Sequence, residues 1–236
     1  LLYRKYDSSL GKTHCVASYC NVNEALAQGP TADLIKSFCC VDGKSYKEST
    51  VTSAKDFRLE KLIKTRDPRF EATFYDSLTN SSRSSMLYVV KFIPRAALNY
   101  LSEPGGTPAT AWTGTNNTTG FPVLRYSEVL LNWIEAKAEL ATLGGAAVTQ
   151  DDIDLSINAI RDRQSTKMPH VTLAGNALKV NGVEINDPDR DATVKPILWE
   201  IRRERRVELA YEGVRFNDLR RWGKLEYADM VKNKKL

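Results

Sequence analysis

The side chains with the most chemical potential are concentrated near the C-terminus, between Pro196 and Gly223. Arginines and glutamates alternate there over two helical turns and more, and aromatic residues flank them. Such a stretch has two possible uses. A bare basic face would neutralise nucleic-acid phosphates, whereas arginines matched by carboxylates would form ion pairs that stabilise the fold.

The spacing of the acids favours the second use. A glutamate recurs every four residues through this stretch, so the glutamates share one helical face, and pairs are expected at Glu200–Arg203 and Arg205–Glu208. We therefore predict a packed, ion-paired helix over 193–211 that does not bind nucleic acid. Its charged residues are Glu200, Arg203, Glu204, Arg205, Arg206 and Glu208, and it docks through Ile197, Leu198, Ile201, Val207 and Leu209.

Two patterns resemble metal sites without completing them. The segment from Asp187 to Asp191 opens like a calcium loop, but Ala192 stands where that loop needs glycine and Leu198 where it needs a bidentate glutamate. We predict instead that it ends a hairpin and caps the next helix. The four cysteines, Cys15, Cys20, Cys39 and Cys40, lack zinc spacing even with His14 nearby. No metal or cofactor is predicted, and disulfides among the cysteines stay open.

Aromatic residues in the first half are the candidate ligand platforms, because an aromatic face can stack on a sugar ring. The predicted ligand-binding residues are Trp112, Tyr100, Tyr19 and Tyr6. For Trp112, which stands in a polar loop, the alternative is that its ring packs back onto its own domain.

No catalytic constellation is evident. His14 and His170 are far apart in the sequence, and neither a nucleophile elbow, a zinc-protease helix nor a phosphate loop is present. Glu128, Asn132, Glu135 and Glu139 line one helical face without a neighbouring His, Lys or metal ligand, so that face is expected to be solvated or capped.

Composition describes an ordinary globular chain. It has 236 residues, 42% of them hydrophobic, and a net charge of +5 from 34 basic and 29 acidic residues. No apolar run approaches the roughly 20 residues of a membrane span. The opening segment is too short and too soon charged for a signal peptide, so the chain reads as a mature or trimmed fragment.

The distribution of glycine and proline, which interrupt helices and strands, divides the chain into two parts. Residues 1–120 are predicted to be loop-rich and irregular, with helices at 31–38 and 54–64, strands at 70–75 and 86–93, and polar loops at 77–85 and 105–120. Residues 121–236 are predicted to be helical: one helix from 121 to Gly144-Gly145, a second over 149–163, a hairpin turning at Asn181-Gly182, the arginine-rich helix, and a short segment over 215–222.

Three stretches occur in the order and spacing of a known family. They are FPVLRYSEVLLNWIEA at 121–136, INAIRDR at 157–163 and EIRRERRVELAYEGVRFNDLRRWGK at 200–224, with further landmarks at 30–34, 42–44 and 66–70. Together they resemble the SusD/RagB family of outer-membrane nutrient-binding lipoproteins. The resemblance implies a mainly α fold, a tetratricopeptide-like helical array with loop-rich irregular regions and small β-hairpins, of which this chain would be the C-terminal part.

The resemblance also implies a function. Such proteins sit on the outer face of the outer membrane, held by a lipid anchor outside this fragment, and pass glycans or other nutrient oligomers to a TonB-dependent, SusC-like transporter without chemistry. The starch utilisation system is the model for this arrangement. The alternative function is a carbohydrate-active hydrolase. A nucleic-acid-binding helical protein is a minor alternative, which the ion-paired interpretation of the arginine-rich helix opposes.

Overall fold

The computed structural model of the chain describes residues 2–16, 29–76, 87, 89–91, 93–97 and 109–229. Its internal contacts group into two units, Leu1–Pro30 with Glu71–Arg125, and Thr31–Phe70 with Tyr126–Leu236. The predicted division at residue 120 stays a prediction. In the described part, no helix is both long and apolar enough to cross a membrane.

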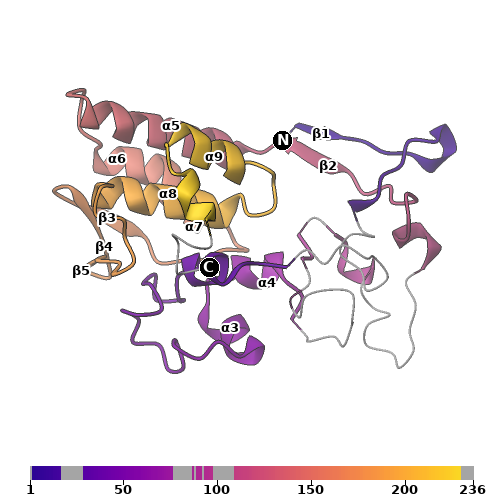
Figure 1. Ribbon diagram of the computed structural model, residues 1–236, viewed down its shortest axis with the longest axis horizontal. Helices are drawn as coiled ribbons and strands as arrows, with labels where there is room; N and C mark the ends of the chain where they lie inside the picture. The colour runs from indigo at the N-terminus through magenta and orange to yellow at the C-terminus, as the bar shows by residue number, and fades with distance from the viewer. Residues whose placement is uncertain are drawn as a thin grey trace. The chain divides into compact units, whose positions relative to one another are not determined.

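The second unit is built on two helical segments that follow one another closely (Figure 1). Helix α5 covers Tyr126–Thr142 and buries Leu131, Ile134 and Ala138 at helical spacing. It ends before Gly144, whose φ of 92° suits glycine. The predicted second helix is confirmed as α6 (Gln150–Ile153), the π-helical turn η4 (Asp154–Asn158) and α7 (Ala159–Arg161).

A capping box fixes the start of this second helical segment. The Thr149 side chain accepts a hydrogen bond from the Asp152 amide, and the Asp152 carboxylate accepts one from the Thr149 amide at 2.8 Å. Two otherwise unpaired amides are thereby satisfied. The acidic residues were predicted at the start of this helix, and one of them, Asp152, stabilises that start as part of the cap.

The arginine-rich helix is α8 (Pro196–Glu208), and α9 (Arg215–Arg221) and the 3₁₀ turn η5 (Leu225–Ala228) follow it. Pro196 occupies the first turn, where its missing N–H costs nothing. Leu198, Ile201, Val207 and Leu209 are buried, as predicted. Gly213, with φ of 79°, lies in the turn between α8 and α9.

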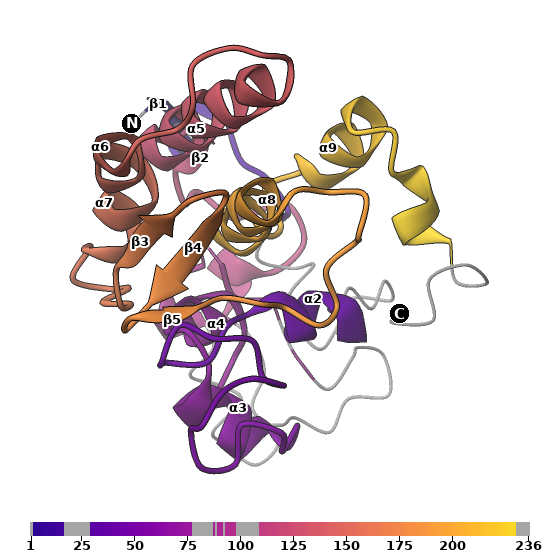
Figure 2. The same cartoon turned by 90° about the vertical axis from the view of Figure 1, so that its left-hand side faces the viewer.

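A three-stranded antiparallel sheet covers part of this helical layer. Strands β3 (Val171–Ala174), β4 (Ala177–Val180) and β5 (Val183–Glu184) lie beside α8 and below α6 and α7 in Figure 2. The predicted turn is confirmed, because Asn181 and Gly182 both have positive φ (49° and 76°). The sequence patterns did not predict strand β3. Gly175, in the tight turn between β3 and β4, also adopts a positive φ.

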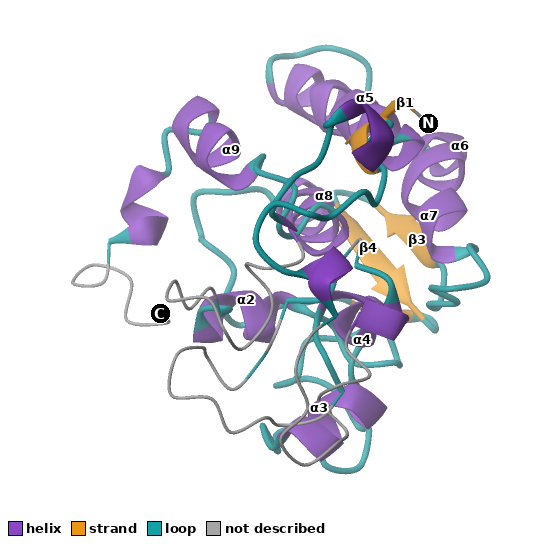
Figure 3. Cartoon of the chain, turned by 90° about the vertical axis from the view of Figure 1, so that its right-hand side faces the viewer, coloured by secondary structure: helices purple, strands orange, loops and turns teal. Residues whose placement is uncertain are grey.

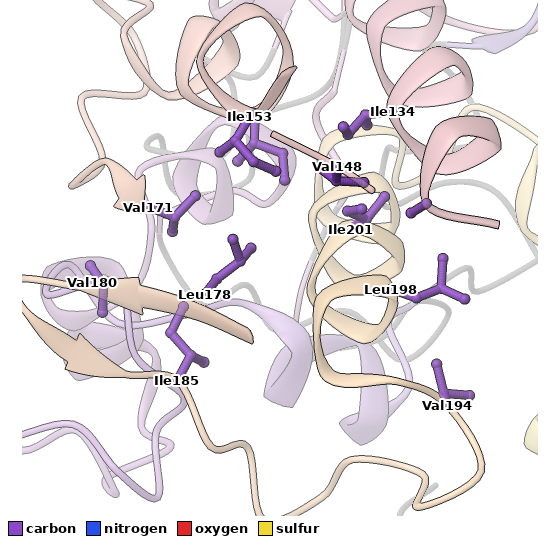
Figure 4. Close-up of a cluster of buried hydrophobic side chains, with 12 residues drawn as sticks. Ile134, Val148, Ile153, Val171, Leu178, Val180, Ile185, Val194, Leu198 and Ile201 are labelled. Carbon is purple, nitrogen blue, oxygen red and sulfur yellow. The ribbon is translucent and has the colours of Figure 1, made fainter. Parts of the chain in front are cut away.

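The hydrophobic core lies where the helices meet the sheet (Figure 4). Ile134 comes from α5, Ile153 from α6, Leu178 from β4 and Ile201 from α8, and all four are fully or almost fully buried. Aliphatic side chains from four elements thus share one core. Its further members are Ala138, Val148, Ile157, Val171, Val180, Ile185, Val194 and Leu198.

The first part of the same unit contains short helices joined by long connections (Figure 3). Helix α2 (Ala32–Ser37) is capped by Thr31 and contacts α8, and α3 (Leu59–Thr65) follows after a long loop. The helix predicted over 54–64 therefore begins five residues late. The predicted strand at 70–75 is wrong, because Arg69–Thr73 forms helix α4, which the Asp67 carboxylate starts by accepting the Arg69 amide at 2.9 Å.

In the first unit, strand β1 (Leu2–Arg4) pairs antiparallel with β2 (Phe121–Leu124) (Figure 1). The helix predicted to open at 121 therefore begins five residues later, at Tyr126. Pro122 is compatible with an edge strand that needs no amide from it. At the strand predicted over 86–93, the described residues show an isolated bridge between Phe74 and Val89, and 86, 88 and 92 lie outside them.

Candidate functional site

A pocket of about 370 Å³ opens beside α8 within the second unit. This volume falls in the usual range for small-molecule sites. Its walls combine aromatic rings with charged groups of both signs. The lining includes the aromatic residues Tyr46, Trp199, Trp222 and Tyr227, the cations Lys36, Arg202, Arg203, Arg206 and Arg215, and the acids Asp33, Asp187, Asp189, Asp191 and Glu226.

Helical periodicity explains one wall of the pocket. Trp199, Arg202, Arg203 and Arg206 are spaced i, i+3, i+4 and i+7 on α8, so they project from one side of the helix. Ile201, in the same helix, instead points into the aliphatic core. The helix therefore presents polar groups to the pocket while its apolar side holds it in place.

The acidic loop 187–191 forms a second wall, and its three carboxylates diverge. Asp187 accepts the Trp199 indole N–H at 2.9 Å, Asp189 pairs with Lys47 at 2.8 Å, and Asp191 pairs with Lys224 at 2.7 Å. Each carboxylate thus has its own donor instead of converging on one ion. In the described part of the chain, no three metal-ligating side chains come together.

Asp191 is held ionised. Burial opposes this, but the hydrogen bonds from Lys224 and Tyr227 outweigh it and hold the pKa of Asp191 well below its usual range. Burial, and next the hydrogen bond that its hydroxyl donates to the Asp191 carboxylate, raise the pKa of Tyr227. Asp191 also accepts the Thr193 amide at 2.8 Å, so it caps the turn before α8, whose N-cap residue is Lys195.

Three of the pocket arginines have carboxylate partners. Arg206 Nη1 lies 2.7 Å from Asp33 Oδ2, Arg202 Nη2 lies 2.7 Å from Glu139 Oε1, and Arg203 pairs with Glu200. The Arg202 guanidinium also sits 4.4 Å from the centre of the Trp222 ring. These contacts fix the orientation of the guanidinium groups that face the pocket.

Two further glutamates of α8 pair with arginines that do not line the pocket. Glu204 is buried between Arg161 (2.8 Å) and Arg69 (2.7 Å), and Glu208 pairs with Arg69 at 3.1 Å and with Arg163 at 2.7 Å. The acids of α8 thus join it to partners from distant parts of the sequence.

Two predictions about charged residues are wrong, the partner of Arg205 and the exposure of Glu135. Arg205 pairs not with Glu208 but with Asp218 of α9 at 2.8 Å, and it donates to Asn132 of α5 at 2.7 Å. Glu135, expected on a solvated or capped face, is 2% exposed and accepts from Trp222 Nε1 and Arg221 Nη2 at 2.5 Å each. In both cases partners come from α9 and the residue that follows it, and not from neighbours on the same helix.

Of the aromatic residues predicted as ligand platforms, the two that the structure describes, Tyr6 and Trp112, do not line this pocket. The Tyr6 ring stands edge-on to His14 at 4.4 Å, with Arg4 5.3 Å from its centre, and Trp112 packs against Ile93 and Ala97. Tyr19 and Tyr100 lie outside the described residues. Their binding roles stay predictions. Sequence reasoning missed the pocket aromatics, although Trp199 and Trp222 flank the arginine-rich stretch.

Two of the cysteines are accounted for by burial. Cys39 and Cys40 are free thiols, and burial raises the pKa of Cys39 to about 12. The Cys40 sulfur accepts a hydrogen bond from Arg66 Nη1 at 3.3 Å. Within the described part of the chain, these two residues therefore form no disulfide.

Comparison with known proteins agrees with this architecture. No curated protein sequence matches the chain. A solved structure, a SusD-like carbohydrate-binding protein from Bacteroides fragilis, superposes with a TM-score of 0.63 at 26% sequence identity. The match covers 94% of this chain and 41% of that protein, so the chain spans well under half of its solved relative. It confirms the predicted SusD-like helical fold with small β-hairpins.

The family itself is established by sequence. Residues 83–235, more than half of the chain, match the family model described as the SusD family. The matched region includes α5, the second helical segment, the sheet, α8 and α9. The chain is a member of the SusD family.

Proposed function

We propose that this chain binds a glycan and that the pocket beside α8 is the binding site. The observation that carries the proposal is the convergence of aromatic rings and oriented polar groups on one cavity. Tyr46, Trp199 and Tyr227 supply apolar ring surface, while the arginines and aspartates around them supply donors and acceptors for hydroxyl groups. The carbohydrate-binding role of the solved relative supports the same ligand class.

We propose that binding occurs without chemistry on the glycan. A glycosidase needs a carboxylic acid whose pKa is raised so that it can protonate the leaving oxygen. In the pocket wall, Asp191 has its pKa lowered, and Asp33 and Asp187 accept donors from Arg206 and Trp199. These acids are arranged as hydrogen-bonding and structural groups.

In the whole protein, the bound glycan would pass to a TonB-dependent, SusC-like transporter at the surface of the outer membrane, with a lipid anchor holding the protein there. Membership of the SusD family supports this role. Co-purification from detergent-solubilised outer membranes tests it. Recovery of the full-length protein without any TonB-dependent barrel would contradict the partnership.

The network of α8 does not favour nucleic-acid binding. A nucleic-acid helix leaves its cations available to phosphates, whereas Arg202, Arg203, Arg205 and Arg206 each pair with a carboxylate. We propose a structural role for this network, which holds α8 against α2, α5 and α9.

Calorimetric titration against a panel of neutral and acidic oligosaccharides tests the binding site. Trp199→Leu is expected to weaken glycan binding at least about tenfold, because it removes an aromatic wall. Trp133→Leu is the matched control, since Trp133 lies half-exposed on α5 and does not line the pocket. Trp112→Leu tests the alternative platform in the first unit.

Three results would contradict the proposal. Binding that depends on Trp112 and not on Trp199 would move the site to the first unit. Binding of no glycan by a folded chain would remove the function, and release of shorter sugars during incubation would favour a hydrolase.

A further inference from the structure

Arg215 differs from the other arginines of the pocket wall. Its guanidinium lies 5.6 Å from the centre of the Trp222 ring, and within the described part of the chain it has no hydrogen bond or ion pair. Its side chain is nevertheless partly enclosed by the pocket wall. An enclosed cation without a hydrogen-bonded anion is unusual, because burial of a charge is costly unless that charge is paired.

The neighbouring acids are already occupied. Asp33 pairs with Arg206, Asp191 with Lys224, and Asp187 with the Trp199 indole. Glu135 and Asp218 both pair with Arg221. None of these carboxylates makes a hydrogen bond to Arg215. Acids lie near its guanidinium, but none of them neutralises its charge through a direct contact.

The local electrostatics agree with that geometry. Burial, and next the positive charge of Arg206, lower the pKa of Arg215 to about 9. Asp33 and Asp218 act in the opposite direction without cancelling the shift. An anion placed against the guanidinium would relieve both the lost hydration and the repulsion from Arg206.

We propose that the pocket binds an acidic sugar, whose carboxylate or sulfate oxygens lie against the guanidinium of Arg215 while its ring contacts the aromatic wall. The guanidinium presents a planar fork of donors that suits two oxygens of one anionic group. Tyr46, Trp199 and Tyr227 line the same cavity and offer ring surface to the sugar. The inference rests on the proposed glycan-binding function of this pocket.

Matched sugar pairs test the inference by calorimetry. Galacturonic acid is compared with its methyl ester, glucuronic acid with its methyl ester, and glucose 6-sulfate with glucose. Each pair keeps the ring and removes the charge. The acidic member is expected to bind about 10- to 100-fold more tightly in at least one pair, since a charge-assisted contact is being added. The carboxylate and sulfate pairs distinguish the two anion sources.

Variants of α9 locate the effect. Arg215→Gln is expected to abolish the preference for the acidic member, so that the two members of each pair bind with similar affinity. Arg215→Lys should keep part of the preference, because the charge remains without the fork. Arg220→Gln is the control, since Arg220 is exposed on the same helix and does not line the pocket. Thermal melting establishes that each variant is folded, and the comparison within the unmodified chain stands without any variant.

The outcomes separate this inference from the proposed function. Equal affinity for charged and uncharged sugars would overturn the acidic-sugar inference and leave glycan binding intact. A preference that persists in Arg215→Gln would overturn the assignment to Arg215. Binding of an aspartate-rich peptide, with no sugar bound, would overturn both in favour of a protein ligand.

Discussion

Arg161 and Glu204 form a buried ion pair that joins α7 to α8. Arg161 Nη2 lies 2.8 Å and Nε 3.1 Å from Glu204 Oε2, and the two side chains are 3% and 4% exposed. Arg69 approaches the other carboxylate oxygen of Glu204 at 2.7 Å. One glutamate thus balances two buried arginines that come from distant parts of the sequence.

Glu204→Gln should destabilise the chain strongly. The variant leaves the buried Arg161 guanidinium without its carboxylate and removes one of the three carboxylates that surround Arg69. Breaking a buried ion pair typically costs about 3–5 kcal/mol of unfolding free energy. Urea denaturation followed by circular dichroism measures the loss. Glu139→Gln is the control, because the Glu139–Arg202 pair is partly exposed and such pairs contribute about 1 kcal/mol or less. Equal effects in the two variants would contradict the special role of Glu204.

The same carboxylate predicts an acid-sensitive stability. Burial alone would raise the pKa of Glu204, but the charges of Arg161 and Arg69 lower it to about 2, from an ordinary value of 4.5. The unfolded chain therefore binds the proton more tightly. The stabilisation is fully present above pH 4.5 and is lost as the pH falls toward 2. Urea midpoints at pH 3, 4, 5 and 6 should fall less steeply in Glu204→Gln, and parallel curves would contradict this origin.

Gly43 occupies a turn where both backbone conformation and space exclude a side chain. Its φ is 81°, and an added Cβ would lie 2.7 Å from Val180 Cγ2. Gly43→Ala should therefore lose more stability than Gly182→Ala, whose glycine has a similar φ of 76° but open space around it. The control shares the backbone strain, about 1–2 kcal/mol, so the difference between the variants measures the clash. Partial recovery in Gly43→Ala/Val180→Ala would confirm it by the same urea denaturation.

Local sequence patterns predicted the positions of helices and turns better than the pairing of charged side chains. The capped start at Thr149, the turn at Asn181-Gly182 and the apolar face of α8 follow from neighbours within a few residues, and the structure contains all three. The predicted Arg205–Glu208 pair is wrong, because Arg205 pairs instead with Asp218, which comes from another helix. Glu135 is buried for the same reason, since Trp222 and Arg221 reach it across 87 and 86 residues of sequence.

Sequence patterns could not predict the candidate site, for a related reason. Its walls come from α2, the loop after Phe38, the acidic loop 187–191, α8 and α9 with its following turn, and no spacing rule joins these segments. Trp112 was predicted as a ligand platform because it stands in a polar loop. Trp199 and Trp222 lie instead within the charged C-terminal stretch, for which a structural role was predicted.

Cys39 and Cys40 should resist thiol reagents in the folded chain. Both side chains are buried, and burial raises the pKa of Cys39 to about 12, so little reactive thiolate forms near neutral pH. Peptide mapping by mass spectrometry after brief iodoacetamide treatment is expected to find both unmodified in buffer and both modified in urea. Rapid modification of Cys39 in buffer would contradict its burial.

The contact between Arg206 and Asp33 gives the final prediction. Arg206 Nη1 lies 2.7 Å from Asp33 Oδ2, both side chains are 16% exposed, and the pair joins α8 to α2. Arg206→Ala should lower the melting temperature because it breaks this connection between two helices. Asp33→Ala should do the same, and the double variant should lose less than the sum of the single losses, with a coupling energy of about 0.5–3 kcal/mol. Unchanged stability in Arg206→Ala together with lost glycan binding would contradict the structural role and place Arg206 in ligand recognition, because a side chain that only holds α8 to α2 cannot be removed without weakening that contact.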